Sequence, residues 1–185
     1  MAGYYDNSCG DDVPVHACDP CAPREFGRIG SSGWIHKDYY PTIAADPTNA
    51  ALWIAGQISG QVIILPETRG SMTPTPVMGP GYGRQKEKLI NFDYEANIFD
   101  PNYSDNCDHY NGLMLSPNYH FVYVTSSKLH ITQVPVTVIP APPIADDVTS
   151  EVVWDIKARW TYNLHPCPTD IPDGVFAECY IADPA

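Results

Sequence analysis

The chain has 185 residues, enough for one domain with a sizeable core, and its hydrophobic content of 44% is ordinary for a globular protein. Ten Lys and Arg against 22 Asp and Glu give a formal net charge of -12, which argues against capture of nucleic acid and against binding to an anionic membrane. The first ten residues contain neither a basic nor an apolar segment, so we expect the protein to fold in a cytoplasm.

Composition and hydrophobic periodicity divide the chain into three segments. Residues 1–25 are rich in Asp, Cys and Pro and have no period, which predicts an irregular N-terminal arm. Residues 26–162 contain the periodic elements and are expected to form a single domain. Residues 163–185 again have no period and many prolines, which indicates an irregular tail.

The first half of the domain has short elements. We expect strand character in 26–37, a mostly buried helix from Asp46-Pro47 to Gly56, and an apolar strand over 61–65. Asp suits the position before a helix and Pro suits its first turn. Residues 70–83 contain four Gly and three Pro, which predicts a long loop without a helix or a central strand.

Two long strands stand out in the second half, at 89–99 and 150–162. In each, apolar side chains alternate with polar ones, so each strand has a buried face and a polar face. The polar faces are formed by Asn91, Asp93, Glu95 and Asn97 in the first strand, and by Glu151, Asp155, Lys157 and Arg159 in the second. A polar face of this kind is either simply exposed to solvent or forms the wall of an enclosed space.

Between these strands the pattern predicts a helix, a hairpin and an edge strand. A second Asp-Pro pair, at 100–101, opens the helix, whose apolar face we assign to Tyr103, Cys107, Tyr110 and Met114. Residues 118–125 and 128–132 flank Ser-Ser and form the hairpin. Pro135 places the strand 134–139 at a sheet edge, and 140–147 is a stiff connector.

The six cysteines leave three alternatives open. Cys18-x-x-Cys21, with Cys9 and His16 nearby, suits a zinc site, but no second pair completes it. Disulfides formed after release and reduced thiols are the other two, and without a secretory signal we favour thiols. Cys107 is expected to be a small buried side chain. The state of Cys9, Cys18, Cys21, Cys167 and Cys179 stays undecided at this point.

No motif of catalytic chemistry is found. Walker A, dinucleotide-binding, zinc-protease and serine-hydrolase patterns are absent from the sequence. Asp108 and His109, with Ser104 nearby, are adjacent on a helix and point apart, so we interpret them as helix surface. The sequence therefore predicts no enzyme and no catalytic, cofactor-binding or metal-binding residues.

Other polar and aromatic groups have ordinary interpretations. Asp146-Asp147 belongs to the connector, and His120 and His130 are expected to be exposed or paired in the hairpin. The twelve tyrosines, Tyr39-Tyr40 among them, suit either a protein interface or packing of loops against the core. The absence of regular strand–helix alternation favours an antiparallel β-sandwich or barrel with one flanking helix and long loops.

The order of elements in 89–169 resembles that of tail tube proteins of tailed bacteriophages. The matching stretches are LINFDYEANIF, DPNYSDNCDHYN, YHFVYV, VTVIPAPPIADD and SEVVWDIKARW. The resemblance implies a structural virion protein that assembles in the host cytoplasm into stacked, hexameric rings of the tail. Other tail proteins would be its partners, and DNA would pass through the lumen without specific binding during ejection.

The resemblance also implies roles for particular segments. The loop 70–83 would reach a neighbouring subunit or ring, and the two long strands would join those of neighbours in an inner β-barrel. Lys157 and Arg159 would pair with carboxylates on adjacent strands or subunits. The Cys-rich arm departs from the family. The alternatives are another phage structural protein, such as a neck or capsid-decoration protein, and a secreted β-sandwich binding module with disulfides.

Overall fold

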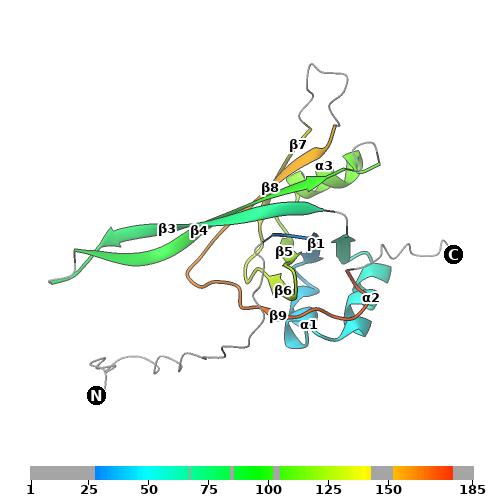
Figure 1. Ribbon diagram of the computed structural model, residues 1–185, viewed down its shortest axis with the longest axis horizontal. Helices are drawn as coiled ribbons and strands as arrows, with labels where there is room; N and C mark the ends of the chain where they lie inside the picture. Colours follow the sequence, from blue (N-terminus) through cyan, green and yellow to red (C-terminus); the bar gives the residue numbers. More distant parts are fainter. Residues whose placement is uncertain (1–27, 67, 84–85, 102–104, 143–151, 177–185) are drawn as a thin grey trace.

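The computed structural model describes residues 28–66, 68–83, 86–101, 105–142 and 152–176 (Figure 1). Two antiparallel sheets pack against each other, which confirms the predicted fold class. One sheet has the strand order β2-β1-β5-β6-β9 and the other has the order β3-β4-β8-β7. Helices α1 and α2 lie beside the five-stranded sheet, and α3 lies beside β7 (Figure 1).

The five-stranded sheet is buried on both faces. Trp34 and Phe121 pack toward the second sheet, while Ile35 and Val122 pack toward the helices. Because β5 has no solvent-facing side, its sequence YHFVYV is a continuous apolar run. The strands are β1 (Ser31–His36), β2 (Val62–Leu65), β5 (Tyr119–Val124), β6 (Lys128–Ile131) and β9 (Thr169–Asp170). The predicted strands at 26–37 and 61–65 and the predicted hairpin are thereby confirmed.

The four-stranded sheet covers the core with one face, and no described helix or strand covers the other, which we call the free face. Along its two central strands, Tyr94, Ala96 and Ile98 pair with Trp160, Ala158 and Ile156, and all six are buried. The alternation predicted for both long strands is therefore confirmed. The strands are β3 (Arg69–Pro80), β4 (Glu87–Asp100), β8 (Trp154–Tyr162) and β7 (Thr137–Ala141), with β7 at the predicted edge.

The first two helices differ from the prediction. Helix α1 (Tyr40–Ala45) was not predicted, and α2 (Ala50–Ile58) begins four residues after Asp46. The side chain of Asn49, and not of Asp46, accepts a hydrogen bond from the Ala51 N–H and caps the helix. Gly56 does not end α2; a Cβ there would lie 2.4 Å from Val62 Cγ2, so this glycine lets the helix approach β2.

The buried face of α3 (Cys107–Leu115) also differs from the prediction. Tyr110 and Leu113 are buried, whereas Cys107 is exposed and Met114 is half exposed. At 3.6 residues per turn, Cys107 and Met114 share one side of the helix, about a quarter turn from the centre of the buried face. The prediction that Cys107 is buried was therefore wrong, and Tyr103 lies outside the described residues.

The largest difference concerns the predicted loop at 70–83, most of which is strand β3. Gly70 N–H and C=O bond to Ile29, on the side away from β4. Pro74 and Pro76 have the same parity as Gly70, so their missing N–H groups also fall on the outer edge of the sheet. An edge strand accommodates both prolines without losing a bond to β4, which is why the composition was misleading.

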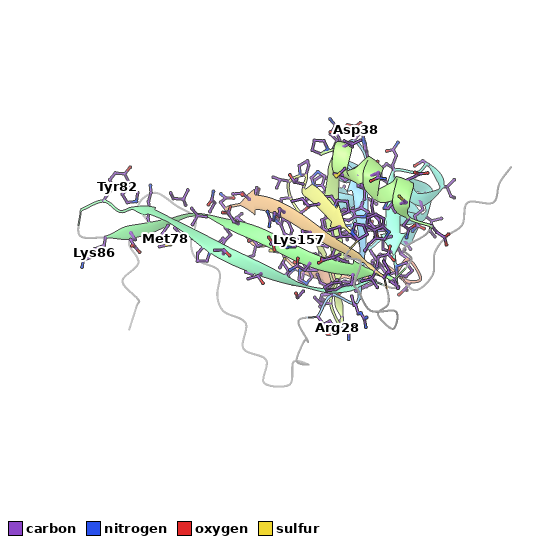
Figure 2. All side chains as sticks on the ribbon, turned by 90° about the horizontal axis from the view of Figure 1, so that it is seen from above. Arg28, Asp38, Met78, Tyr82, Lys86 and Lys157 are labelled. Atoms are coloured by element: carbon purple, nitrogen blue, oxygen red, sulfur yellow. The ribbon has the colours of Figure 1, made fainter. Side chains whose placement is uncertain are left out.

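Strands β3 and β4 form a hairpin that extends well beyond the body of the molecule (Figures 1 and 2). At its far end the pairing register shifts between Val77 and Met78. The other end of β4 pairs with β8 and lies over the core. Strand β4 thus belongs both to the packed body and to the projecting hairpin.

The segment after β8 contributes to the core. Strand β9 pairs with β6, and Val175 and Phe176 are buried among the side chains of the second core cluster. The irregular tail predicted from residue 163 therefore includes packed residues up to 176. The predictions for residues 1–25, for most of the connector and for the last nine residues concern segments outside the described part.

Candidate functional site

The free face of the four-stranded sheet has a polar side chain at most of its outward positions, with Phe99 and Ile139 among the apolar exceptions. Cross-strand register aligns these side chains in rows, one of which is Thr73, Glu95, Arg159 and Thr137. In this row Arg159 Nε donates to Glu95 Oε2 at 2.7 Å, and in the next row Thr161 Oγ1 donates to Asp93 Oδ1 at 2.6 Å. The predicted pairing of Arg159 with a carboxylate on an adjacent strand is confirmed.

Charges on this face nearly cancel. Asp93, Glu95 and Asp155 supply the carboxylates of the paired rows, and Arg69, Lys157 and Arg159 supply the cations. Lys157 lies opposite Asn97, and no ion pair joins it to any described residue. The acidity of the chain is therefore not concentrated on this face, which is polar and close to neutral.

Prolines lie at both sides of this sheet. The outer edge of β3 presents Pro74 and Pro76, which offer carbonyl acceptors but no N–H. On the other side, β8 continues past the start of β7, and Pro135 stands where a partner for Thr161 would be. A hollow of about 750 Å³ lies there, lined in part by Asp93, Glu95, Arg159 and Thr161. Any neighbour that adds to the sheet must accommodate these prolines.

Exposed apolar side chains gather on the projecting hairpin. Met78 is 49% exposed, Ile90 51% and Tyr82 79%, and Leu89 is similarly exposed. Figure 2 shows Met78, Tyr82 and Lys86 near the end of the hairpin, far from the body. Lys88 Nζ lies 4.8 Å from the centre of the Tyr82 ring, so one face of the ring meets a cation. Projecting apolar side chains of this kind are typical of protein–protein contact surfaces.

The described cysteines are exposed thiols. Cys107 and Cys167 are both free and solvent-accessible. No group of His, Cys, Asp or Glu within the described ranges could hold a metal ion. Cys9, Cys18, Cys21, Cys179 and His16 lie outside those ranges, so the choice between zinc, disulfides and thiols stays a prediction for them.

The two hairpin histidines, predicted to be exposed or paired, are partly covered and both make contacts. His120 is buried in β5, where Nδ1 donates to Thr132 O at 2.8 Å and the ring stacks on Tyr40 with centroids 3.8 Å apart. Burial lowers the pKa of His120, and the bond to Thr132 opposes that shift. His130 stacks on Tyr123. Sequence reasoning missed the burial of His120 because it did not identify β5 as covered on both faces.

Asp108 and His109 do not meet in a catalytic arrangement. Asp108 is exposed in the first turn of α3, while His109 is partly buried and its Nε2 has no hydrogen-bond partner among the described residues. Burial lowers the pKa of His109, and the nearby charge of Asp100 opposes the shift. Ser104 and Asp146-Asp147 are outside the described residues.

Asp100 is a buried carboxylate that was not predicted from the sequence. Asp100 is only 2% exposed; its Oδ2 accepts hydrogen bonds from the Tyr110 hydroxyl and, at 2.8 Å, from Asn106 Nδ2. Burial, together with the bond to Asp100, raises the pKa of Tyr110 far above its usual value. Asp100 has the same strand parity as the buried Ile98, and that signal in the sequence could have revealed it.

Comparison with known proteins adds no relative: no protein-family model, no curated protein and no solved structure matches this chain. Within the described part, the helices are too short or too polar to cross a membrane. Two surfaces of the chain thus remain as the basis for a function. They are the free face of the four-stranded sheet and the projecting hairpin.

Proposed function

We propose that this chain is a structural subunit that assembles with copies of itself into stacked rings, as the tail tube of a bacteriophage does. The hairpin β3–β4 is the observation on which the proposal depends. It continues the sheet away from the core and ends in exposed Met78, Tyr82, Leu89 and Ile90. An isolated two-stranded hairpin is marginally stable in water, so a contact with a neighbour would stabilise this one.

The free sheet face suits the wall of a conduit. Glu95 and Arg159 pair within the sheet, and carboxylates are interspersed with the other cations, so the face offers no continuous basic stripe to a passing polyanion. Threonine and asparagine side chains fill most of the other positions. In the proposed ring this face lines the lumen, and DNA passes it without being held along its length.

The prolines of the sheet edges shape how copies would join. Because Pro74 and Pro76 provide only acceptors, a neighbouring strand gains few bonds along the middle of β3. Side-chain contacts of the hairpin end therefore supply much of the interface in the proposed assembly. This arrangement also hinders the unregulated edge-to-edge pairing that an open sheet invites.

Electron microscopy of the purified full-length protein in negative stain tests the proposal. Rings with a central opening, or tubes of constant diameter, are the expected particles at high protein concentration. A monodisperse monomer at the same concentration would overturn the proposal. Rings without stacking would leave a ring-forming virion component, such as a neck protein, in place of a tube protein.

A further inference from the structure

A second hollow, of about 410 Å³, lies on the free sheet face at the end opposite the hairpin tip. Among the described residues, two arginines line it, together with small and apolar side chains: Arg28, Gly30, Thr68, Arg69, Phe99, Pro101 and Val153. Neither arginine forms a salt bridge with any residue of the described ranges. Two like charges on neighbouring chain segments destabilise each other unless an anion lies between them.

A short β-bridge brings the two arginines together. Ile29 N–H donates to Gly70 O at 3.0 Å, and Gly70 N–H donates to Ile29 O at 3.2 Å. Ile29 is buried, so Arg28 points to the opposite, free side, and Arg69 points there because its neighbour Gly70 faces inward. The two arginines are diagonal neighbours across the bridge, a spacing that long side chains span.

The bridge is fixed in place by its glycine. A Cβ on Gly70 would lie 2.1 Å from the carbonyl oxygen of Asn97, so no other residue fits without moving β4. Gly30, which lines the hollow, bonds through its N–H to Val124 O at 2.8 Å. The backbone under both arginines is therefore held by both sheets, and the hollow is part of the packed body. Figure 2 shows Arg28 beside the body, far from Tyr82 and Lys86.

The chemistry of the hollow matches a phosphate joined to a flat ring. Guanidinium groups bind phosphate oxygens through paired N–H donors. Phe99 is 39% exposed and, with Pro101 and Val153, gives the hollow an apolar wall. Asp155 lies in the same row as Arg69, on the other side of Phe99, and it forms no salt bridge with either arginine among the described residues. Asp100 is buried and bonded to Tyr110.

We propose that this hollow binds a nucleotide, with Arg28 and Arg69 holding the phosphate and Phe99 contacting the base. Aromatic rings contribute to nucleotide binding because every base has a face that stacks. The overall charge of the chain opposes long nucleic acids, whereas a single nucleotide meets only the local charges, which are those of the two arginines and of Asp155 across Phe99. This inference does not depend on the proposed assembly and stands or falls separately.

Calorimetric titration of the full-length protein with adenosine monophosphate, inorganic phosphate and adenosine tests the site. The monophosphate should bind saturably and more tightly than either of its parts. Arg28→Gln and Arg69→Gln should each weaken it about tenfold, the loss expected for a charged hydrogen bond. Phe99→Ala should weaken the monophosphate and leave inorganic phosphate unchanged.

Arg159→Gln is the matched control, because Arg159 lies on the same sheet face but is paired with Glu95. The Arg159→Gln variant should bind adenosine monophosphate like the unmodified protein. If it loses as much affinity as the Arg28 and Arg69 variants, the binding is general charge attraction and the proposed site is wrong. Absence of saturable binding at millimolar ligand would overturn the proposal, as would unchanged binding in both arginine variants. Equal affinity for phosphate and monophosphate, unaffected by Phe99→Ala, would overturn the assignment to a nucleotide.

Discussion

The two halves of β4 have the same sequence pattern but different surroundings. From Tyr94 to Asp100 the even-numbered side chains are buried under the second sheet and α3. In the hairpin, Ile90 is also even-numbered and is 51% exposed; it lies at the register shift, where it has no partner on β3. The difference teaches that alternation defines which side chains share a face, while the cover for that face comes from distant parts of the chain.

The largest expected effect separates these halves with a matched pair of substitutions. Ile98→Ala should lower the free energy of unfolding by about 2–5 kcal/mol, because it leaves a cavity between packed layers. Ile90→Ala should change it by less than about 0.5 kcal/mol in the unassembled protein. Urea unfolding at low protein concentration measures both. Equal losses would mean that the hairpin is packed against the body.

A smaller loss is expected at the buried carboxylate where β4 meets α3. Tyr110→Phe removes the hydroxyl that donates to Asp100 and leaves that buried oxygen with one partner fewer. The expected cost is about 1–3 kcal/mol. Tyr119→Phe is the control, since its hydroxyl bonds to no described residue, and it should be close to neutral in thermal unfolding. A neutral Tyr110→Phe would show that Asp100 does not need this donor.

The body should also lose stability as the pH falls. The pKa of His120 is lowered in the folded protein, so below about 6.5 the unfolded chain takes up a proton first. Stability is therefore fully present above that pH and declines as the pH falls toward the lowered pKa. His120→Asn keeps a donor for Thr132 O and should flatten the decline between pH 7.5 and pH 5.5 in urea unfolding, roughly the range of an ordinary histidine. If His120→Asn leaves the pH dependence of the free energy of unfolding unchanged, His120 is not the cause of the decline.

The smallest effect is expected on the free face. The Glu95–Arg159 pair is partly exposed, so a double-mutant cycle with Glu95→Gln and Arg159→Gln should give a coupling of about 0.2–1 kcal/mol. High salt should reduce it. A coupling that is larger and insensitive to salt would indicate that neighbouring copies bury this face even in dilute solution.

Much of the β-structure could be predicted from the sequence because one face of each strand is buried. The alternation of Trp154, Ile156, Ala158 and Trp160 places their side chains in the core, as the structure does. The apolar run in β5 and the turn at Ser126-Ser127 likewise identify the hairpin. These patterns are local, so they can be recognised in a short stretch of sequence without knowing how the rest of the chain folds.

The failures have non-local causes. Pro74 and Pro76 argue against a strand unless their shared parity and an edge position are recognised together. Arg28 and Arg69 are 41 positions apart in the sequence numbering and meet only through the bridge between Ile29 and Gly70. The surroundings of Asp100 likewise depend on where α3 packs. Candidate sites assembled from separate segments are the part that sequence patterns do not reveal.

Sedimentation velocity of one matched pair tests most directly whether the hairpin joins copies of this chain. Ile90→Asp places a charge on the hairpin, and Ile58→Asp places one on an isoleucine that is 63% exposed at the end of α2. We expect the unmodified protein and Ile58→Asp to sediment as assemblies and Ile90→Asp to sediment as a smaller species. The same sedimentation coefficient for all three proteins would contradict the account.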